Sequence, residues 1–149
     1  MYIRAAHEPD EMKEPVTALY CRTAQACEIG IASQVSLLWK YAKENGLGNI
    51  AIYSDNGFSG ANLDRPALQR LKADVDAGLV GLVLVKDIAR ISRNFLEAPV
   101  FLYGIKRKGV EIRFVMDGFS YDEPPFRIAD LCSSVYSYYA KTKKGAKAD

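Results

Sequence analysis

The stretch LVLVKDIARISRN (residues 82–94) joins a buried strand to a pair of arginines. Residues 82–85 are a continuous apolar run with β-branched members, which is typical of a strand covered on both faces. Arg90 and Arg93 follow at a spacing that places both on one face of a helix. Open α/β sheets bind ligands beyond the carboxyl ends of their strands, and a guanidinium group matches two phosphate oxygens at once. The stretch therefore predicts a phosphate site, with a solvated helix start as the alternative.

The composition is that of one ordinary globular domain. The 149 residues are 49% hydrophobic and 26% charged, and the net charge of +2 is too small to indicate nucleic-acid binding by itself. Three cysteines without a C-x-x-C motif predict a reduced, cytoplasmic setting. The polar first 14 residues and the lack of an apolar run of about 20 residues predict no signal peptide and no membrane span. The single histidine, His7, argues against a histidine-based metal site.

Strand and helix patterns alternate along the chain. Strands are predicted over residues 16–21, 49–53, 80–86 and 110–116. Residues 1–15 are expected to be a flexible leader, residues 16–125 the folded domain, and residues 126–149 an amphipathic helix start with a basic tail. This alternation predicts an α/β fold with a largely parallel sheet.

Three helices separate these strands. They are predicted over residues 31–45, from Arg65 and Pro66 to Gly78, and over residues 95–108. The expected buried positions are Val35, Leu38, Trp39 and Ala42 in the first helix and Leu68, Leu71 and Val75 in the second. Residues 23–30 are expected to be a loop, and Asp64 is the expected cap of the second helix.

Polar residues follow the predicted strands. Arg22, Arg90 and Arg93 come just past strand ends, and Asp55 follows the second strand. The carboxyl ends of parallel strands meet at one edge of a sheet, so these side chains are expected to converge. Three guanidinium groups without metal ligands could neutralise a phosphodiester and the charge that develops during phosphoryl transfer.

Several short motifs resemble the catalytic domain of the serine recombinases, the resolvase/invertase family that includes the large recombinases of conjugative elements and phages. They are Tyr20-Cys21-Arg22, Gln34, YSDNGFSG (residues 53–60) with Arg65-Pro66, and Arg90-Ile91-Ser92-Arg93-Asn94. The resemblance runs from about residue 16 to the start of the last helix. It implies a three-layer αβα fold with four to five strands and a C-terminal dimerisation helix. It also implies DNA cleavage through a phosphoserine link, with no cofactor and no metal.

The resemblance assigns roles to residues of this chain. Arg22, Arg90 and Arg93 would bind the DNA phosphate. Arg65, Asp55 and Gln34 match supporting positions, and Ser59 matches the serine of the loop.

Two residues depart from the family pattern. The family reads Tyr-x-Arg-Val-Ser, so the position of the nucleophile is Ala24, whose methyl group cannot attack phosphorus. The family also carries an acidic residue where this chain has Ala89, which removes a hydrogen-bond acceptor from the site. The Thr23 hydroxyl is a candidate substitute for the missing serine, but adjacent side chains of an extended segment point in opposite directions, so Thr23 should point away from the site of residue 24. Cys21 and Cys27 cannot be placed from the sequence.

The C-terminal residues determine which binding partners are expected. Family members continue the last helix and add a DNA-binding domain, whereas this chain ends at Asp149. Lys141, Lys143 and Lys144 could contact backbone phosphates without sequence preference, or could simply be solvated. The apolar face of residues 126–139 predicts association as a homodimer or as a heteromer with a full-length recombinase.

Three functional hypotheses remain open. In the first, the chain is a cleavage-deficient catalytic domain from a mobile element that regulates, or dimerises with, an active recombinase. In the second, it is a fragment of an active recombinase with altered residues. In the third, it is an unrelated flavodoxin-like module such as a receiver domain with Asp55 as phosphoacceptor. The third is disfavoured because Arg22 stands where an acidic pair is expected and residues 23–30 contain no glycine-rich phosphate loop.

Overall fold

The computed structural model describes residues 2–3, 14–94, 96–116, 119–120, 136 and 140. The strands are β1 (Tyr2–Ile3), β2 (Val16–Thr23), β3 (Ile50–Asn56), β4 (Val80–Val85), β5 (Glu111–Phe114) and β6 (Phe119–Ser120). Among the described residues, the helices are α1 (Glu28–Glu44), α2 (Pro66–Asp76), α3 (Ile88–Ile91) and α4 (Glu97–Arg107).

The strands form one sheet in the order β1-β3-β2-β4-β5-β6. The central strands β3, β2, β4 and β5 are parallel, which confirms the predicted α/β class. The two-residue strands β1 and β6 add antiparallel edges. A flexible leader is expected at residues 1–15, but Tyr2 and Ile3 form a short strand that pairs with Tyr53 and Ile52.

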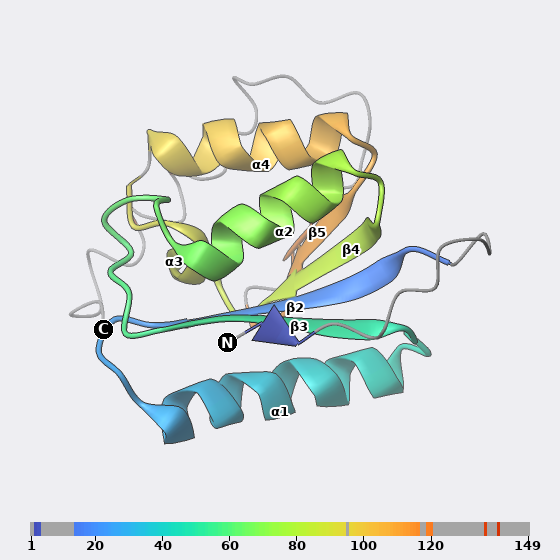
Figure 1. The fold of residues 1–149 in the computed structure, drawn as a ribbon, viewed down its shortest axis with the longest axis horizontal. Helices are drawn as coiled ribbons and strands as arrows, with labels where there is room; N and C mark the ends of the chain where they lie inside the picture. Colours follow the sequence, from blue (N-terminus) through green and yellow to red (C-terminus); the bar gives the residue numbers. More distant parts are fainter. Residues whose placement is uncertain are drawn as a thin grey trace.

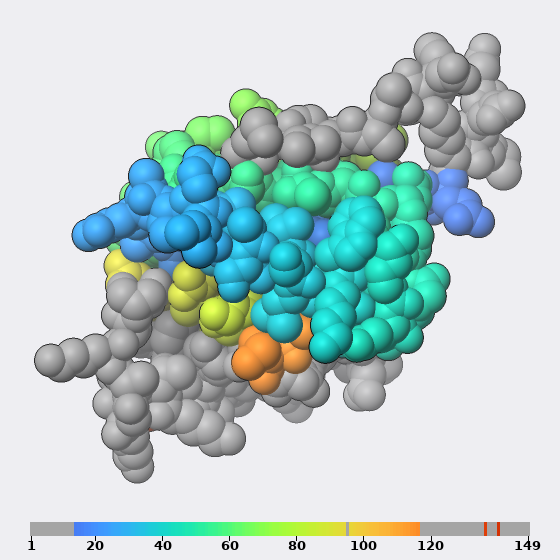
Figure 2. Space-filling view, turned by 90° about the horizontal axis from the view of Figure 1, so that it is seen from below, coloured from blue at the N-terminus to red at the C-terminus, as the bar shows by residue number. Residues whose placement is uncertain are grey.

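The helices make two layers around this sheet (Figure 1). Of the helices described, only α1 lies on one face of the sheet, and Figure 2 looks onto that face. Helices α2, α3 and α4 cover the other. Strand β4 is buried along residues 82–85, as its apolar run predicts. Leu68, Leu71 and Val75 of α2 are buried as expected, and each contributes roughly 1.5–3 kcal/mol by leaving water.

Helix α1 differs from its prediction at its start and on one face. It begins at Glu28 rather than near residue 31, because Cys27 caps it with its Sγ, which accepts a hydrogen bond from the Gly30 N–H at 3.3 Å. Leu38 is fully buried, but Trp39 is 41% exposed and lies against the ammonium group of Lys43. The prediction that Trp39 is a core residue is therefore wrong.

The predicted C-terminal helix and basic tail lie outside the described residues, except that Tyr136 and Ala140 are helical. Lys141, Lys143 and Lys144 belong to this undescribed part. Within the described residues, no helix is both long and apolar enough to span a bilayer.

Candidate active site

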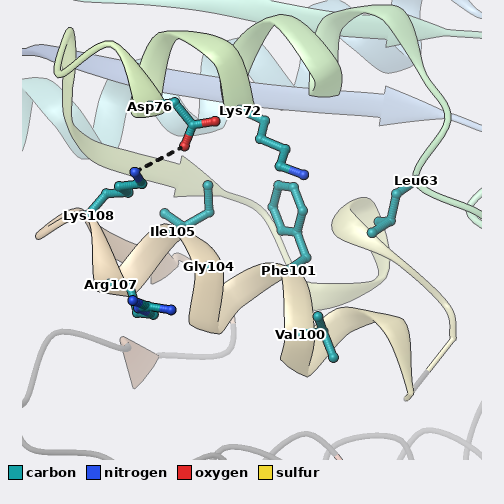
Figure 3. Close-up of a pocket in the computed structure, with 9 residues that line it drawn as sticks. All are labelled: Leu63, Lys72, Asp76, Val100, Phe101, Gly104, Ile105, Arg107 and Lys108. Atoms are coloured by element: carbon teal, nitrogen blue, oxygen red, sulfur yellow. Dashed lines mark ion pairs between the residues drawn. The ribbon is translucent and has the colours of Figure 1, made fainter.

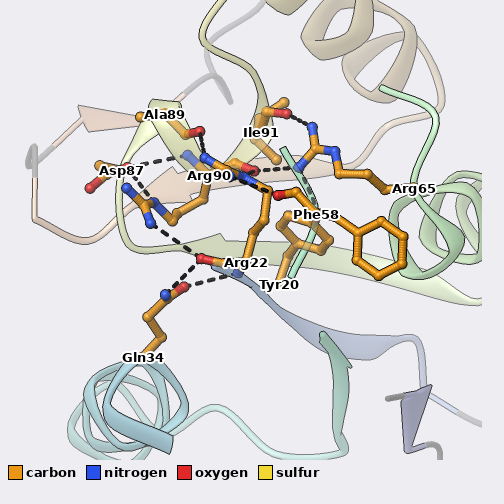
Figure 4. A network of polar contacts seen from close by, with 9 residues as sticks. All are labelled: Tyr20, Arg22, Gln34, Phe58, Arg65, Asp87, Ala89, Arg90 and Ile91. Atoms are coloured by element: carbon orange, nitrogen blue, oxygen red, sulfur yellow. Dashed lines mark hydrogen bonds and ion pairs between the residues drawn. The ribbon is translucent and has the colours of Figure 1, made fainter. Parts of the chain in front are cut away.

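Arg22 lies inside strand β2, not past its end. The strand continues through Thr23 and pairs Arg22 with Asp55 of β3. Its side chain is fully buried and donates to three backbone carbonyls: Nε to Arg90 at 3.2 Å, Nη1 to Phe58 at 3.0 Å and Nη2 to Ala89 at 2.8 Å. Figure 4 shows these contacts. Arg22 therefore ties the loop after β3 to the helical turn after β4.

Arg65 approaches the same turn from the start of α2. It is 1% exposed, and its Nη1 donates to the Arg90 carbonyl at 2.8 Å while its Nη2 donates to the Ile91 carbonyl. Its Nε bonds to the Asn62 carbonyl at 3.1 Å. The last carbonyls of a helix have no partner within the helix. Two buried guanidinium groups satisfy them at the end of α3.

Arg90 is oriented by two contacts. Its Nε donates to Asp87 Oδ1 at 3.2 Å and its Nη1 donates to the Arg22 carbonyl at 3.2 Å. That carbonyl also accepts from Gln34 Nε2 at 2.8 Å, and the Arg22 N–H donates to Gln34 Oε1 at 3.0 Å. Gln34 is buried in α1, so it locks the Arg22 peptide from the opposite layer (Figure 4).

Arg93 does not share a helix face with Arg90. Helix α3 ends at Ile91, and Ser92 is already extended, so the predicted helical spacing is wrong there. Arg93 is exposed, and its backbone N–H donates to the Gly60 carbonyl at 2.9 Å. A Cβ added to Gly60 would lie 3.2 Å from Arg93 Cγ and 2.8 Å from Arg22 Nη2. The absence of a side chain at Gly60 therefore allows both arginines to pack against this loop.

Asp55 is a buried helix cap rather than an exposed acid. It is 1% exposed and accepts from the N–H groups of Ala67 at 2.8 Å and Leu68 at 3.1 Å. Its Oδ2 also accepts from the Tyr20 hydroxyl at 2.7 Å. The expected cap Asp64 is exposed, and the N-cap residue, Arg65, makes no side-chain capping bond, so that prediction is wrong.

Tyr20 connects this carboxylate to Arg65. Its hydroxyl accepts from Arg65 Nη1 at 2.9 Å while it donates to Asp55. Burial raises the pKa of Tyr20 above its usual range, so the phenol keeps the proton that it donates. The role of Tyr20 could not be predicted from the Tyr-Cys-Arg motif, which shows the residue but not its partners.

The position that the resemblance assigns to the nucleophile lies just past β2. Ala24 is half-buried, and the neighbouring Thr23 hydroxyl donates to Asn56 Oδ1 at 2.8 Å. Cys21 is fully buried, which raises the pKa of its thiol to about 12, whereas Cys27 is exposed at the start of α1. Ser59 is exposed on the loop, and its Oγ accepts from the Ala61 N–H at 3.1 Å.

Sequence reasoning also missed Asp87 and Asn56. Asp87 caps α3 and pairs with Arg90, and its position three residues before Arg90 was an available signal. Asn56 accepts from the Cys27 N–H at 2.7 Å and donates to Glu28 at 2.9 Å, which fixes the entry to α1. Only the fold brings residues 27 and 56 together.

A cavity of about 480 Å³ lies apart from these arginines, between α2 and α4. Phe101 and Ile105 of α4 line it together with Lys72 of α2 and the Asp76–Lys108 ion pair (Figure 3). None of the predicted site residues lines it. Among the described residues, there is also no group of three potential metal ligands.

Fold and site together define a parallel α/β domain whose arginines meet at one edge of the sheet. The chain belongs to the resolvase family, because the family model "Resolvase, N terminal domain" matches residues 17–144. Its fold is that of the resolvase catalytic domains, and the reading as an unrelated receiver-like module is wrong.

Individual relatives agree with this family. The chain is 34% identical over 73 residues to a "Putative DNA recombinase" of Bacillus subtilis (strain 168); the match covers 49% of this chain and 15% of that protein. The matched segment thus spans less than a fifth of the length of that relative.

Solved structures share the fold. The N-terminal catalytic domain of TP901-1 integrase has a TM-score of 0.70 at 23% identity, over 87% of this chain and 97% of that one. A resolvase family site-specific recombinase from Streptococcus pneumoniae has a TM-score of 0.66 at 24% identity, over 88% and 91% of the two chains. These likenesses confirm the resemblance in fold.

Proposed function

We propose that this chain is a serine recombinase catalytic domain that binds DNA phosphates but no longer cleaves DNA. The observation that carries the proposal is Ala24 at the family's nucleophile position, beside a retained set of arginines. A methyl group has no lone pair, so it cannot form the phosphoserine link.

The neighbouring side chains support this loss of cleavage. The Thr23 hydroxyl is engaged with Asn56, and the thiol of Cys21, with a pKa of about 12, is protonated at neutral pH. Cys27 uses its sulfur to cap α1. None of these groups is arranged as an activated nucleophile.

The arginines divide by burial into two proposed roles. Arg22 and Arg65 donate to the carbonyls of α3 and so maintain the turn, with Gln34 and Asp55 as supporting residues. Arg90, on that turn, and the exposed Arg93 are proposed to meet the phosphate directly, with Ser59 on the adjoining loop. Guanidinium groups suit this contact because they bond to two oxygens at once.

The proposed partners are DNA and a second recombinase subunit. Contacts to backbone phosphates, with Lys141, Lys143 and Lys144 contributing, would be weak and independent of sequence. A homodimer, or a heteromer with a full-length recombinase of a mobile element, would give a cleavage-deficient subunit a regulatory role. The free thiols of Cys21 and Cys27 fit a reduced, cytoplasmic setting.

The test is covalent capture of DNA. The chain is incubated with labelled duplexes tiled across the locus that encodes it, and protein–DNA adducts are separated on a denaturing gel. The unchanged chain should give no adduct, whereas Ala24→Ser, alone or combined with Ala89→Asp, should give one. Binding without an adduct, lost on substitution of Arg93, would support the proposed role.

The alternative is an active recombinase fragment in which another group replaces the serine. It predicts an adduct from the unchanged chain, and that result would contradict the proposal. Mass spectrometry of the adduct would then identify the attacking residue.

A further inference from the structure

Arg90 is paired with the carboxylate of Asp87, which also caps the short helix α3. Asp87 Oδ1 accepts from Arg90 Nε at 3.2 Å and from the Arg90 backbone N–H at 3.2 Å. The Arg90 side chain is 13% exposed and that of Asp87 is 19% exposed. Water therefore screens this ion pair less than it screens a pair on the open surface.

The second contact fixes the other side of the guanidinium group. Arg90 Nη1 donates to the Arg22 carbonyl, which Gln34 also holds. One contact comes from the cap of α3 and the other from the central strand β2. Two contacts from separate elements fix the direction of a planar group more firmly than either alone.

We propose that Asp87 is the positioning residue for Arg90. The proposal rests on the phosphate-binding role of Arg90 proposed above. On a helix, residues one turn apart lie side by side, whereas adjacent residues point in different directions. The carboxylate at position 87 therefore reaches the Arg90 side chain directly and fixes its direction.

Asp87 makes two contacts that different substitutions separate. Its carboxylate caps α3 and also pairs with the guanidinium group. Asp87→Asn keeps a good cap but removes the charge, because Asn and Asp cap helices about equally well. Asp87→Glu keeps the charge on a longer side chain but is a poorer cap.

The experiment uses the full chain labelled with ¹⁵N. NMR follows the Arg90 Nε–Hε signal, assigned by its loss in Arg90→Lys, together with the backbone amides of Arg90 and Ser92. In Asp87→Asn, exchange of Arg90 Hε with water should accelerate about tenfold while the amides stay protected. In Asp87→Glu, the Hε signal should persist while the Arg90 amide loses protection.

Other outcomes decide against the positioning role. An unchanged Arg90 Hε signal in Asp87→Asn would overturn it. It would also be overturned if Hε exchange and amide exchange accelerated together in both variants, because that pattern would mean that Asp87 acts only as a helix cap. A separate titration of the unchanged chain with a short DNA duplex tests the role of Arg90 in phosphate binding. If the Hε signature is present but does not move with DNA, the proposed function fails while the positioning role stands.

Discussion

Asp55 belongs to strand β3 but caps helix α2 through the N–H groups of Ala67 and Leu68. We expect Asp55→Ala to lower the free energy of unfolding by about 3 kcal/mol. The substitution leaves the buried N–H groups of Ala67 and Leu68 without the charged acceptor to which they bonded. Urea denaturation measures the change. Asp64→Ala is the matched control; it should change stability by less than about 0.5 kcal/mol, since Asp64 is exposed. Equal effects of the two substitutions would restore Asp64 as the cap.

Burial of the Cys21 thiol is expected to lower the free energy of unfolding at alkaline pH. Burial raises the pKa of its thiol from 9.0 to about 12, so between these values the unfolded chain releases a proton that the folded chain retains. Stability is therefore lost as pH rises through this window, by about 1.4 kcal/mol per pH unit. Urea unfolding at about pH 8 and about pH 10.5 should show a steeper loss for the unchanged chain than for Cys21→Ala. Parallel pH profiles would refute the contribution of Cys21.

At the scale of elements, helix α3 is a four-residue turn whose geometry depends on other elements. Its carbonyls at Ala89, Arg90 and Ile91 accept from Arg22 of β2 and from Arg65 before α2. An isolated turn of this length is unstable, because a single helical turn forms few hydrogen bonds for the conformational freedom it loses. The turn that carries Arg90 is therefore held by tertiary contacts.

Substitution of Arg65 by lysine tests this dependence. Lysine keeps the charge but lacks the planar fork, so we expect Arg65→Lys to lower the free energy of unfolding by about 2 kcal/mol. Hydrogen exchange of the Arg90 and Ser92 amides should accelerate at the same time. Arg70→Lys, an exposed change on the same helix, should leave both measurements nearly unchanged. Slow exchange in Arg65→Lys would mean that the guanidinium bonds do not hold α3.

At the scale of the whole molecule, one polar network links the layers. Gln34 of α1 bonds to the N–H and the carbonyl of Arg22 in β2, and Arg90 of α3 donates to the same carbonyl. Arg65 in turn donates to the Arg90 carbonyl. The exposed arginine of this edge, Arg93, packs against the loop at Gly60. The molecule therefore presents an exposed cationic side chain beside buried ones.

DNA binding should reflect this division. Arg93→Ala should weaken binding and reduce the slope of log affinity against log salt by about one, with little change in stability. Lys40→Ala is the control, because Lys40 lies on α1 and is paired there with Glu44. Fluorescence anisotropy at several salt concentrations measures both slopes. An equal effect of the two substitutions would point to non-specific attraction rather than to a site.

Much of the fold was predictable from local patterns. The run at residues 82–85 predicted β4, and the spacing of Leu68, Leu71 and Val75 predicted the buried face of α2. Boundaries were less predictable, because Arg22 and Asp55 read as loop residues although both lie within strands. In the sequence, a polar side chain marks the apparent end of an apolar strand pattern. In the folded protein, a buried hydrogen-bond network can accommodate such a side chain within the strand.

The amino-acid sequence alone determined the parallel α/β class, the family resemblance and the prediction that Ala24 stands at the nucleophile position, since each depends on residue type and order. Only the tertiary structure decided which arginines hold the fold and which face solvent. Arg22, Arg65 and Arg93 carry the same charge, and nothing in a linear spacing distinguishes them. Their roles follow from burial: a desolvated guanidinium group needs partners, and the carbonyls of α3, remote in sequence, supply them.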